Sequence, residues 1–122
     1  MESPTQCVEL DRIESVSVVR FTDQKVMDPG RIEVMGIELL EMVDGADADQ
    51  MLINFENVRF FSSAAINKLI VVDRRIKARG GRLCLTNLRP EVQDLFSYTS
   101  LDQVFKIHEN QADGIAALGS GD

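Results

Sequence analysis

Two adjacent serines, Ser62 and Ser63, stand where a helical pattern of apolar residues begins. The first turn of a helix leaves backbone N–H groups unpaired and carries a partial positive charge. A phosphate group on a serine at this position would be stabilised by both effects. Serine is also one of the residues preferred as a helix N-cap. The position therefore allows two interpretations, a phosphoacceptor or an N-cap.

Other residue types that often carry chemistry are scattered along the chain. The only histidine, His108, stands at the end of the last predicted strand, where a surface or strand-end role is expected. Asp47 and Asp49 belong to an acidic segment that is expected to be a solvated turn. Cys7 and Cys84 lack the C-x-x-C spacing of a zinc site, which favours two reduced thiols. The sequence also lacks the common nucleotide-binding, hydrolase and metalloprotease motifs. We therefore predict a protein that is not an enzyme and that holds no metal and no cofactor.

The composition suits one acidic globular domain. The chain has 122 residues, with 13 basic against 20 acidic residues and a formal net charge of −7. Because nucleic-acid affinity rests mostly on contacts of Lys and Arg with phosphate, and anionic lipids repel acidic surfaces, neither nucleic acid nor membrane is an expected partner. No apolar run approaches the roughly 18 residues that span a bilayer, and residues 1–4 lack the layout of a signal peptide. A cytoplasmic location is expected.

The hydrophobic periodicity predicts strands that alternate with helices. Strands are predicted at residues 15–21, 51–55, 82–86 and 104–107, and residues 1–14 are expected to lead into the first of them. Helices are predicted at residues 30–43, 63–79, from Pro90 onward and at 110–117, with Gly80 and Gly81 ending the second and Asn110 capping the last. This order favours a single α/β domain, with a mixed and largely parallel central sheet of about 4–5 strands and about four helices.

Several short motifs occur in a recognisable order. An apolar strand at residues 52–55 is followed by a loop and by the sequence Ser-Ser-Ala-Ala-Ile-Asn at residues 62–67. A glycine turn at residues 79–83, a helix start at 88–92 with Leu95 and Phe96, and the segment 100–105 come after it. In order and spacing this set resembles the STAS domain, the family of bacterial anti-sigma factor antagonists and related modules. The resemblance covers roughly residues 10–118, and it leaves residues 1–9 as a lead-in and 119–122 as a tail.

The resemblance implies a regulatory function. In that family a serine at the helix start is phosphorylated by a partner kinase that is also an anti-sigma factor, and a phosphatase of the PP2C type removes the phosphate. The unphosphorylated form binds the partner and frees the sigma factor. Transferred by position, the phosphoacceptor is Ser63, and the implied partner-binding residues are Ser62, Ser63, Ala64, Asn67 and Asp28. Ser62 stands where the family has an aspartate, and Ala65 and Asn67 stand where it has glycines.

Alternatives stay open at several of these positions. Asp28 also suits an N-cap or turn before Pro29. Tyr98, the only tyrosine, suits either a half-buried packing position or an anchor at an interface. In a second interpretation the chain is a constitutive STAS adapter in which Ser63 only caps its helix. In a third it is a sensor of a small ligand or nucleotide that uses the same sheet edge.

Overall fold

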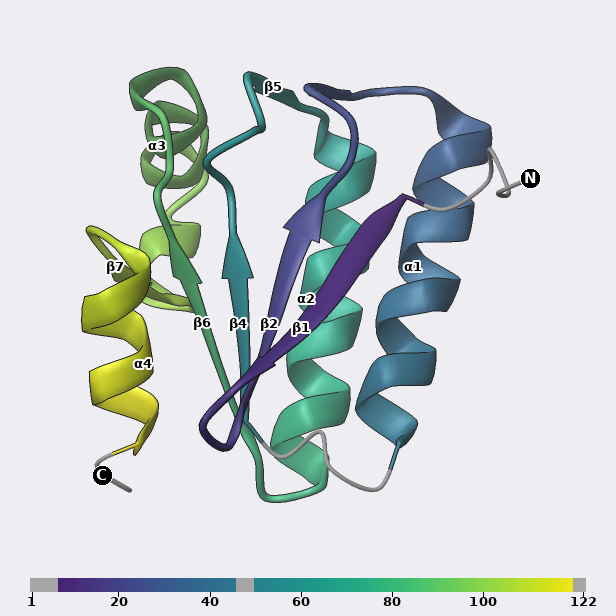
Figure 1. Ribbon diagram of the computed structural model, residues 1–122. Coiled ribbons are helices and arrows are strands. Elements are labelled where there is room, and N and C mark those ends of the chain that lie inside the picture. Colours follow the sequence, from purple (N-terminus) through teal and green to yellow (C-terminus); the bar gives the residue numbers. More distant parts are fainter. Residues whose placement is uncertain (1–6, 46–49, 120–122) are drawn as a thin grey trace.

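The computed structural model describes residues 7–45 and 50–119, and its central sheet carries helices on both faces (Figure 1). The sheet has 5 strands in the order β1-β2-β4-β6-β7. Strand β1 (Val8–Ile13) is antiparallel to β2 (Val16–Phe21), whereas β2, β4 (Gln50–Asn54), β6 (Arg82–Thr86) and β7 (Lys106–His108) are parallel. The predicted α/β fold with a mixed, largely parallel sheet is confirmed.

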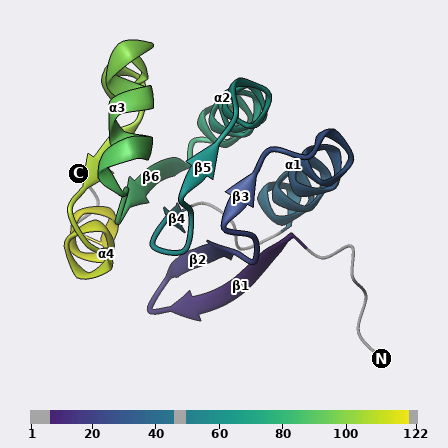
Figure 2. The ribbon, with the colours of Figure 1, turned by 90° about the horizontal axis from the view of Figure 1, so that it is seen from above.

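Helices α1 (Pro29–Asp44) and α2 (Ser63–Ala78) cover one face of the sheet, and α4 (Gln111–Gly119) covers part of the other (Figure 2). Helix α3 (Pro90–Tyr98) and a short 3-10 helix (Leu101–Gln103) lie between β6 and β7 in the chain. Two further short strands, β3 (Lys25–Val26) and β5 (Phe60–Phe61), pair in a separate parallel ribbon. The pairing of β2, β4 and β6 places the ends of these strands at one edge, where α1 and α2 begin.

The larger core lies between the sheet and helices α1 and α2. Its centre under the ends of the strands is aromatic, with rings that meet edge to face at centroid distances such as 5.1 Å between Phe21 and Phe55 and 5.2 Å between Phe55 and Phe61. Such pairs add to the free energy gained by burial alone. Because Phe55 and Phe61 flank residues 56–60, this cluster holds both ends of the loop that leads into α2.

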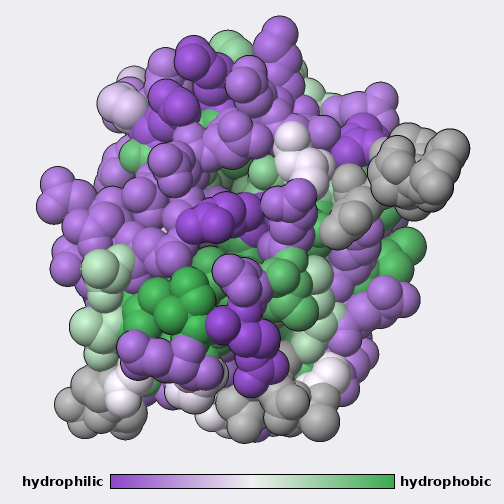
Figure 3. Space-filling view, viewed as in Figure 1, coloured by the Kyte–Doolittle hydropathy of each residue, from purple (hydrophilic) through white to green (hydrophobic). Residues whose placement is uncertain are grey.

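The opposite face of the sheet has a smaller core. It is formed by Val16, Val18, Leu52, Cys84 and Leu118, and α4 is the helix that packs on it. Figure 3 views this face and shows apolar side chains gathered in its lower half, below a hydrophilic upper half. The two faces of the sheet are therefore covered unequally.

The expectation that residues 1–14 only lead into the first strand is wrong, because residues 8–13 form β1 at the edge of the sheet. Charged residues fill half of this strand (Glu9, Asp11 and Arg12), and its burial is confined mainly to Val8. Charged residues are common at exposed sheet edges, where they discourage pairing with other chains. The last strand is also displaced from the predicted residues 104–107, because residues 101–103 form a 3-10 turn and pairing begins only at Lys106.

Candidate functional site

The start of α2 is fixed by Ser62, which is the N-cap residue. Its Oγ accepts a hydrogen bond from the Ala65 N–H at 3.2 Å, and its carbonyl accepts the first helical bond from the Ile66 N–H at 3.0 Å. The interpretation in which Ser63 caps the helix is therefore wrong. The cap is the preceding serine, since its extended backbone (φ −82°, ψ 165°) aims its side chain at the first turn.

Ser63 is the first residue of α2 and is exposed. Within the part of the chain that the structure describes, its hydroxyl has no hydrogen-bond partner. The hydroxyl is therefore accessible to solvent and does not stabilise the fold through a hydrogen bond. No acidic residue lies in the first turn of α2. The positive end of the helix dipole is thus uncompensated by a carboxylate of its own first turn, which favours an anionic group on Ser63.

The segments that lead into α1 and α2 are tied together. Strands β3 and β5 pair Val26 with Phe61, and the Ser62 N–H donates to the Val26 carbonyl at 3.1 Å. The starts of the two helices consequently lie side by side above the end of the sheet (Figures 1 and 2). This pairing brings Asp28 to the same edge of the molecule as Ser63, although 35 positions separate them.

Asp28 is exposed and is the N-cap of α1, where its Oδ2 accepts from the Arg31 N–H at 2.9 Å. Pro29 follows as the first helical residue. The structure therefore gives Asp28 the capping role that the sequence allowed. Its part in binding a partner stays a prediction.

Three further positions of the first turns of α2 divide between the surface and the core. Ala64 and Asn67 are exposed on the outer side, together with Ser63, which precedes Asn67 by one helical turn. Ala65 is fully buried at 0% exposure. Its methyl group therefore points into the core and adds nothing to the outer surface, whereas Asn67 presents an amide there. The structure brings all of the predicted partner-binding residues to one edge, with Asp28 on the neighbouring helix.

Two apolar side chains at this edge were not singled out from the sequence. Met27 is 53% exposed and Phe60 is 49% exposed, and both belong to the segments joined by the β3–β5 ribbon. Lys25 places its Nζ 5.6 Å from the centroid of the Phe60 ring. For Phe60 the sequence does contain a signal of exposure, which is the pair Phe60–Phe61. Adjacent residues of a strand point to opposite sides, so one of the two phenylalanines must face outward.

Tyr98 does not occupy the half-buried packing position that was one of its two interpretations. Its side chain is 89% exposed at the end of α3, so the half-buried interpretation is wrong. The buried side of this helix is formed by Val92 and Phe96. The role of an interface anchor stays a prediction.

The remaining chemical candidates do not converge with Ser63. Cys7 and Cys84 are both buried and form no disulfide among the described residues, and burial raises the pKa of the Cys84 thiol to about 12. The part of the chain that the structure describes contains no cluster of three His, Cys, Asp or Glu side chains suited to a metal ion. It also contains no helix with both the length and the apolar character needed to cross a bilayer. Asp47 and Asp49 lie outside the described residues.

The family model of the STAS domain matches residues 8–114, so the chain belongs to the STAS domain family. In sequence it is 17% identical over 111 residues to the Anti-sigma F factor antagonist of Paenibacillus polymyxa, a match that covers 91% of this chain and 93% of that protein. The expected family and its fold are thereby confirmed.

Solved structures share the fold. The anti-sigma-factor antagonist (STAS) domain protein of Planctomyces limnophilus has a TM-score of 0.83 and 23% identity, with 92% of this chain and 97% of that one covered. The Bacillus cell fate determinant SpoIIAA, solved in its phosphorylated form, has a TM-score of 0.68 and 18% identity, with 90% and 97% covered. At these identities the similarity shows a common architecture, an anti-sigma factor antagonist-like STAS fold.

Proposed function

We propose that this chain is a regulatory module of the anti-sigma factor antagonist type, which binds an anti-sigma factor with serine kinase activity and is switched by phosphorylation of Ser63. The observation that carries the proposal is that the two adjacent serines have different structural roles. Ser62 caps α2, while Ser63 is exposed and its hydroxyl has no hydrogen-bond partner among the described residues. A kinase can therefore modify Ser63 without breaking a bond that holds the fold.

The partner surface proposed here consists of Asp28, Ser62, Ser63, Ala64 and Asn67, extended by the exposed side chains of Met27 and Phe60. Protein interfaces typically have an apolar centre and a polar rim, and this surface combines both kinds of side chain. The surface is presented by the starts of two helices and by a strand ribbon, so its backbone is ordered before a partner arrives. The relatives named as anti-sigma factor antagonists support an anti-sigma factor as the partner.

Phosphorylation would act through charge. In the transfer, the Ser63 Oγ attacks the γ-phosphorus of ATP held by the kinase, the bond to ADP breaks, and the hydroxyl proton passes to a base of the kinase. The product carries about −1.5 to −2 charges at neutral pH. The unpaired N–H groups of the first turn of α2 stabilise this charge, so the fold is retained. In a docked complex the same charge would be desolvated, which weakens binding. A phosphatase of the PP2C type would restore the hydroxyl.

Peptide mass spectrometry on the protein purified from its own host tests the modification. We expect phosphate on Ser63 and none on Ser62, because the Ser62 hydroxyl is engaged in the cap. An unmodified Ser63 under both growth and stress would contradict the switch and favour the constitutive adapter. Phosphate on Ser62 would contradict the assignment of the acceptor.

Binding variants test the consequence. In titrations against the anti-sigma kinase of the same host, Ser63→Asp should weaken binding at least tenfold, which equals about 1.4 kcal/mol. Ser63→Ala should bind as tightly as the unmodified protein. Equal affinities of Ser63→Asp, Ser63→Ala and the parent chain would refute a charge-based switch at this residue.

A further inference from the structure

A cavity of about 370 Å³ lies at the edge of the sheet formed by β6 and β7, with α2 on one side and α4 on the other. It exists because β7 is shorter than β6. The register pairs Lys106 with Cys84 and His108 with Thr86, so the first part of β6, including Arg82, has no strand beside it on this edge. The cavity touches α2 at Asp73, ten residues after Ser63, which is about 15 Å along the helix.

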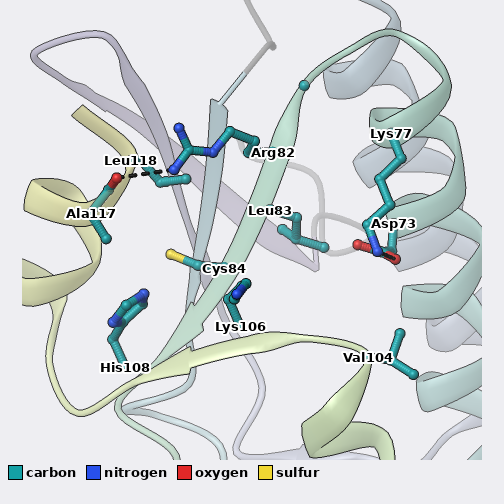
Figure 4. A pocket seen from close by; sticks show the side chains of 11 residues that line it. Asp73, Lys77, Arg82, Leu83, Cys84, Val104, Lys106, His108, Ala117 and Leu118 are labelled. Carbon is teal, nitrogen blue, oxygen red and sulfur yellow. Dashed lines mark hydrogen bonds and ion pairs between the residues drawn. The ribbon is translucent and has the colours of Figure 1, made fainter. Parts of the chain in front are cut away.

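Three basic side chains face this cavity from the same side of the sheet. Residues paired in register point to the same face, and alternate residues of one strand share a face. Arg82, Lys106 and His108 therefore share the face of Cys84, which packs with Leu118 of α4 in the smaller core. Figure 4 shows these basic side chains arranged around the Cys84 sulfur.

The charges around the cavity are unbalanced, although the whole chain carries a net charge of −7. The one acidic side chain among the described lining residues, Asp73, forms an ion pair with Lys77 at 3.0 Å on the α2 side. Arg82 is held in place by a hydrogen bond from its Nη2 to the Ala117 carbonyl at 3.1 Å. Within the described chain, Lys106 and His108 form no ion pair or hydrogen bond through their side chains.

The base of the cavity is apolar. Cys84 and Leu118 are almost wholly buried, at 1% and 3% exposure, and Val104 contributes a partly exposed wall. Because its thiol stays protonated at neutral pH, Cys84 adds no negative charge that would compete with a ligand. A cavity of this size with a mostly apolar lining and a few convergent polar groups is typical of sites for small molecules.

We propose that this cavity binds a small organic anion, a carboxylate or phosphate attached to a short apolar body. The anionic group would pair with Lys106 and His108 beside the fixed guanidinium of Arg82, and the apolar body would contact Cys84 and Leu118. Charge-assisted hydrogen bonds to such an anion are stronger than neutral ones. The site is separate from the start of α2, so this inference does not depend on the proposed function of Ser63.

Amide chemical shifts of the full chain, titrated with hexanoate in a buffer of low ionic strength, test the proposal. We expect saturable shifts centred on residues 82–84, 106–108 and 117–118. Hexanamide, which has the same apolar body without the charge, should bind at least tenfold more weakly. Equal binding of the two compounds, or hexanoate shifts that do not saturate or that spread evenly over the surface, would overturn the proposal.

The variant Lys106→Met removes one charge and retains most of the side-chain length. It should weaken hexanoate binding about tenfold, which equals about 1.4 kcal/mol. Lys25→Met is the matched control, because Lys25 is also an exposed lysine on a short strand but lies in the separate β3–β5 ribbon. Shifts elsewhere in the spectrum verify that both variants remain folded. Unchanged binding by Lys106→Met, or an equal loss in both variants, would refute a localised anion site.

Discussion

The neighbouring hydroxyls of Ser62 and Ser63 allow capping to be separated from modification by two single substitutions. In Ser62→Ala the Ala65 N–H loses its acceptor at 3.2 Å. Loss of an N-cap side chain costs about 1 kcal/mol, with a range of roughly 0.5–2. Since Ala65 is fully buried, water cannot easily replace the lost acceptor, and an unsatisfied buried donor costs about 1–3 kcal/mol. We therefore expect a loss of about 1.5 kcal/mol in the free energy of unfolding.

Ser63→Ala should behave differently. The Ser63 side chain is exposed and has no hydrogen-bond partner among the described residues, so its removal should change the free energy of unfolding by less than about 0.5 kcal/mol. Ser62→Asp supplies an equally good cap and should retain the stability of the parent chain.

Urea unfolding, followed by far-ultraviolet circular dichroism, gives the free energy of unfolding of all three variants. The values can be compared provided that the slope of this free energy against urea concentration is the same in each variant. A loss in Ser63→Ala as large as that in Ser62→Ala would refute the assignment of the cap. So would a Ser62→Ala variant as stable as the parent chain.

Further expectations concern the packing and the thiols. Gly114→Ala should destabilise the fold by about 1–3 kcal/mol in urea unfolding, because the added Cβ would lie 2.7 Å from the Leu52 side chain. Gly36→Ala is the control and should cost little, because its Cβ would meet only a flexible lysine side chain at 2.9 Å. Equal losses of stability in the two variants would contradict this packing. Cys84, with a pKa raised to about 12, should react with iodoacetamide at pH 8 about 10³-fold more slowly than an unperturbed thiol until urea unfolds the chain. Rapid labelling of Cys84 in the folded protein would contradict its burial. Tyr98→Ser should leave the melting temperature nearly unchanged, and a clear loss of stability would show that the ring packs after all.

Much of the fold could be predicted because its local signals agree with its packing. The run Met-Leu-Ile at residues 51–53 predicted a buried strand, and all three side chains are at 0% exposure in β4. Gly80 follows the end of α2 with a φ of 79°, the left-handed conformation that glycine adopts readily, and the Gly81 N–H closes the last turn on the Ile76 carbonyl at 2.9 Å. Asn110 caps α4 as expected, since its Oδ1 accepts from the Asp113 N–H at 2.9 Å.

Features that depend on distant contacts could not be predicted in the same way. The alternation of apolar and polar residues in strand β1 covers only residues 8–11, which is too short to distinguish a strand from a lead-in segment. What makes these residues a strand is their antiparallel pairing with β2. The choice of Ser62 over Ser63 as the cap depends on backbone angles at the end of the loop, and either serine fits the composition of a helix start. The cavity at the sheet edge arises from the different lengths of β6 and β7.

The β3–β5 ribbon has a thermodynamic consequence for recognition. The Gln24 carbonyl accepts hydrogen bonds from the Arg59 and Phe60 N–H groups at 2.8 and 3.2 Å, and the Val26 carbonyl accepts from Ser62 at 3.1 Å. These bonds immobilise the loop before α2 against the loop before α1 in the unbound protein. A partner that docks there would order side chains, each at an entropic cost of about 0.5–1.5 kcal/mol, but it would not have to order the backbone. The conformational entropy lost when a partner binds at the starts of α1 and α2 should therefore be small relative to the surface area that the partner buries.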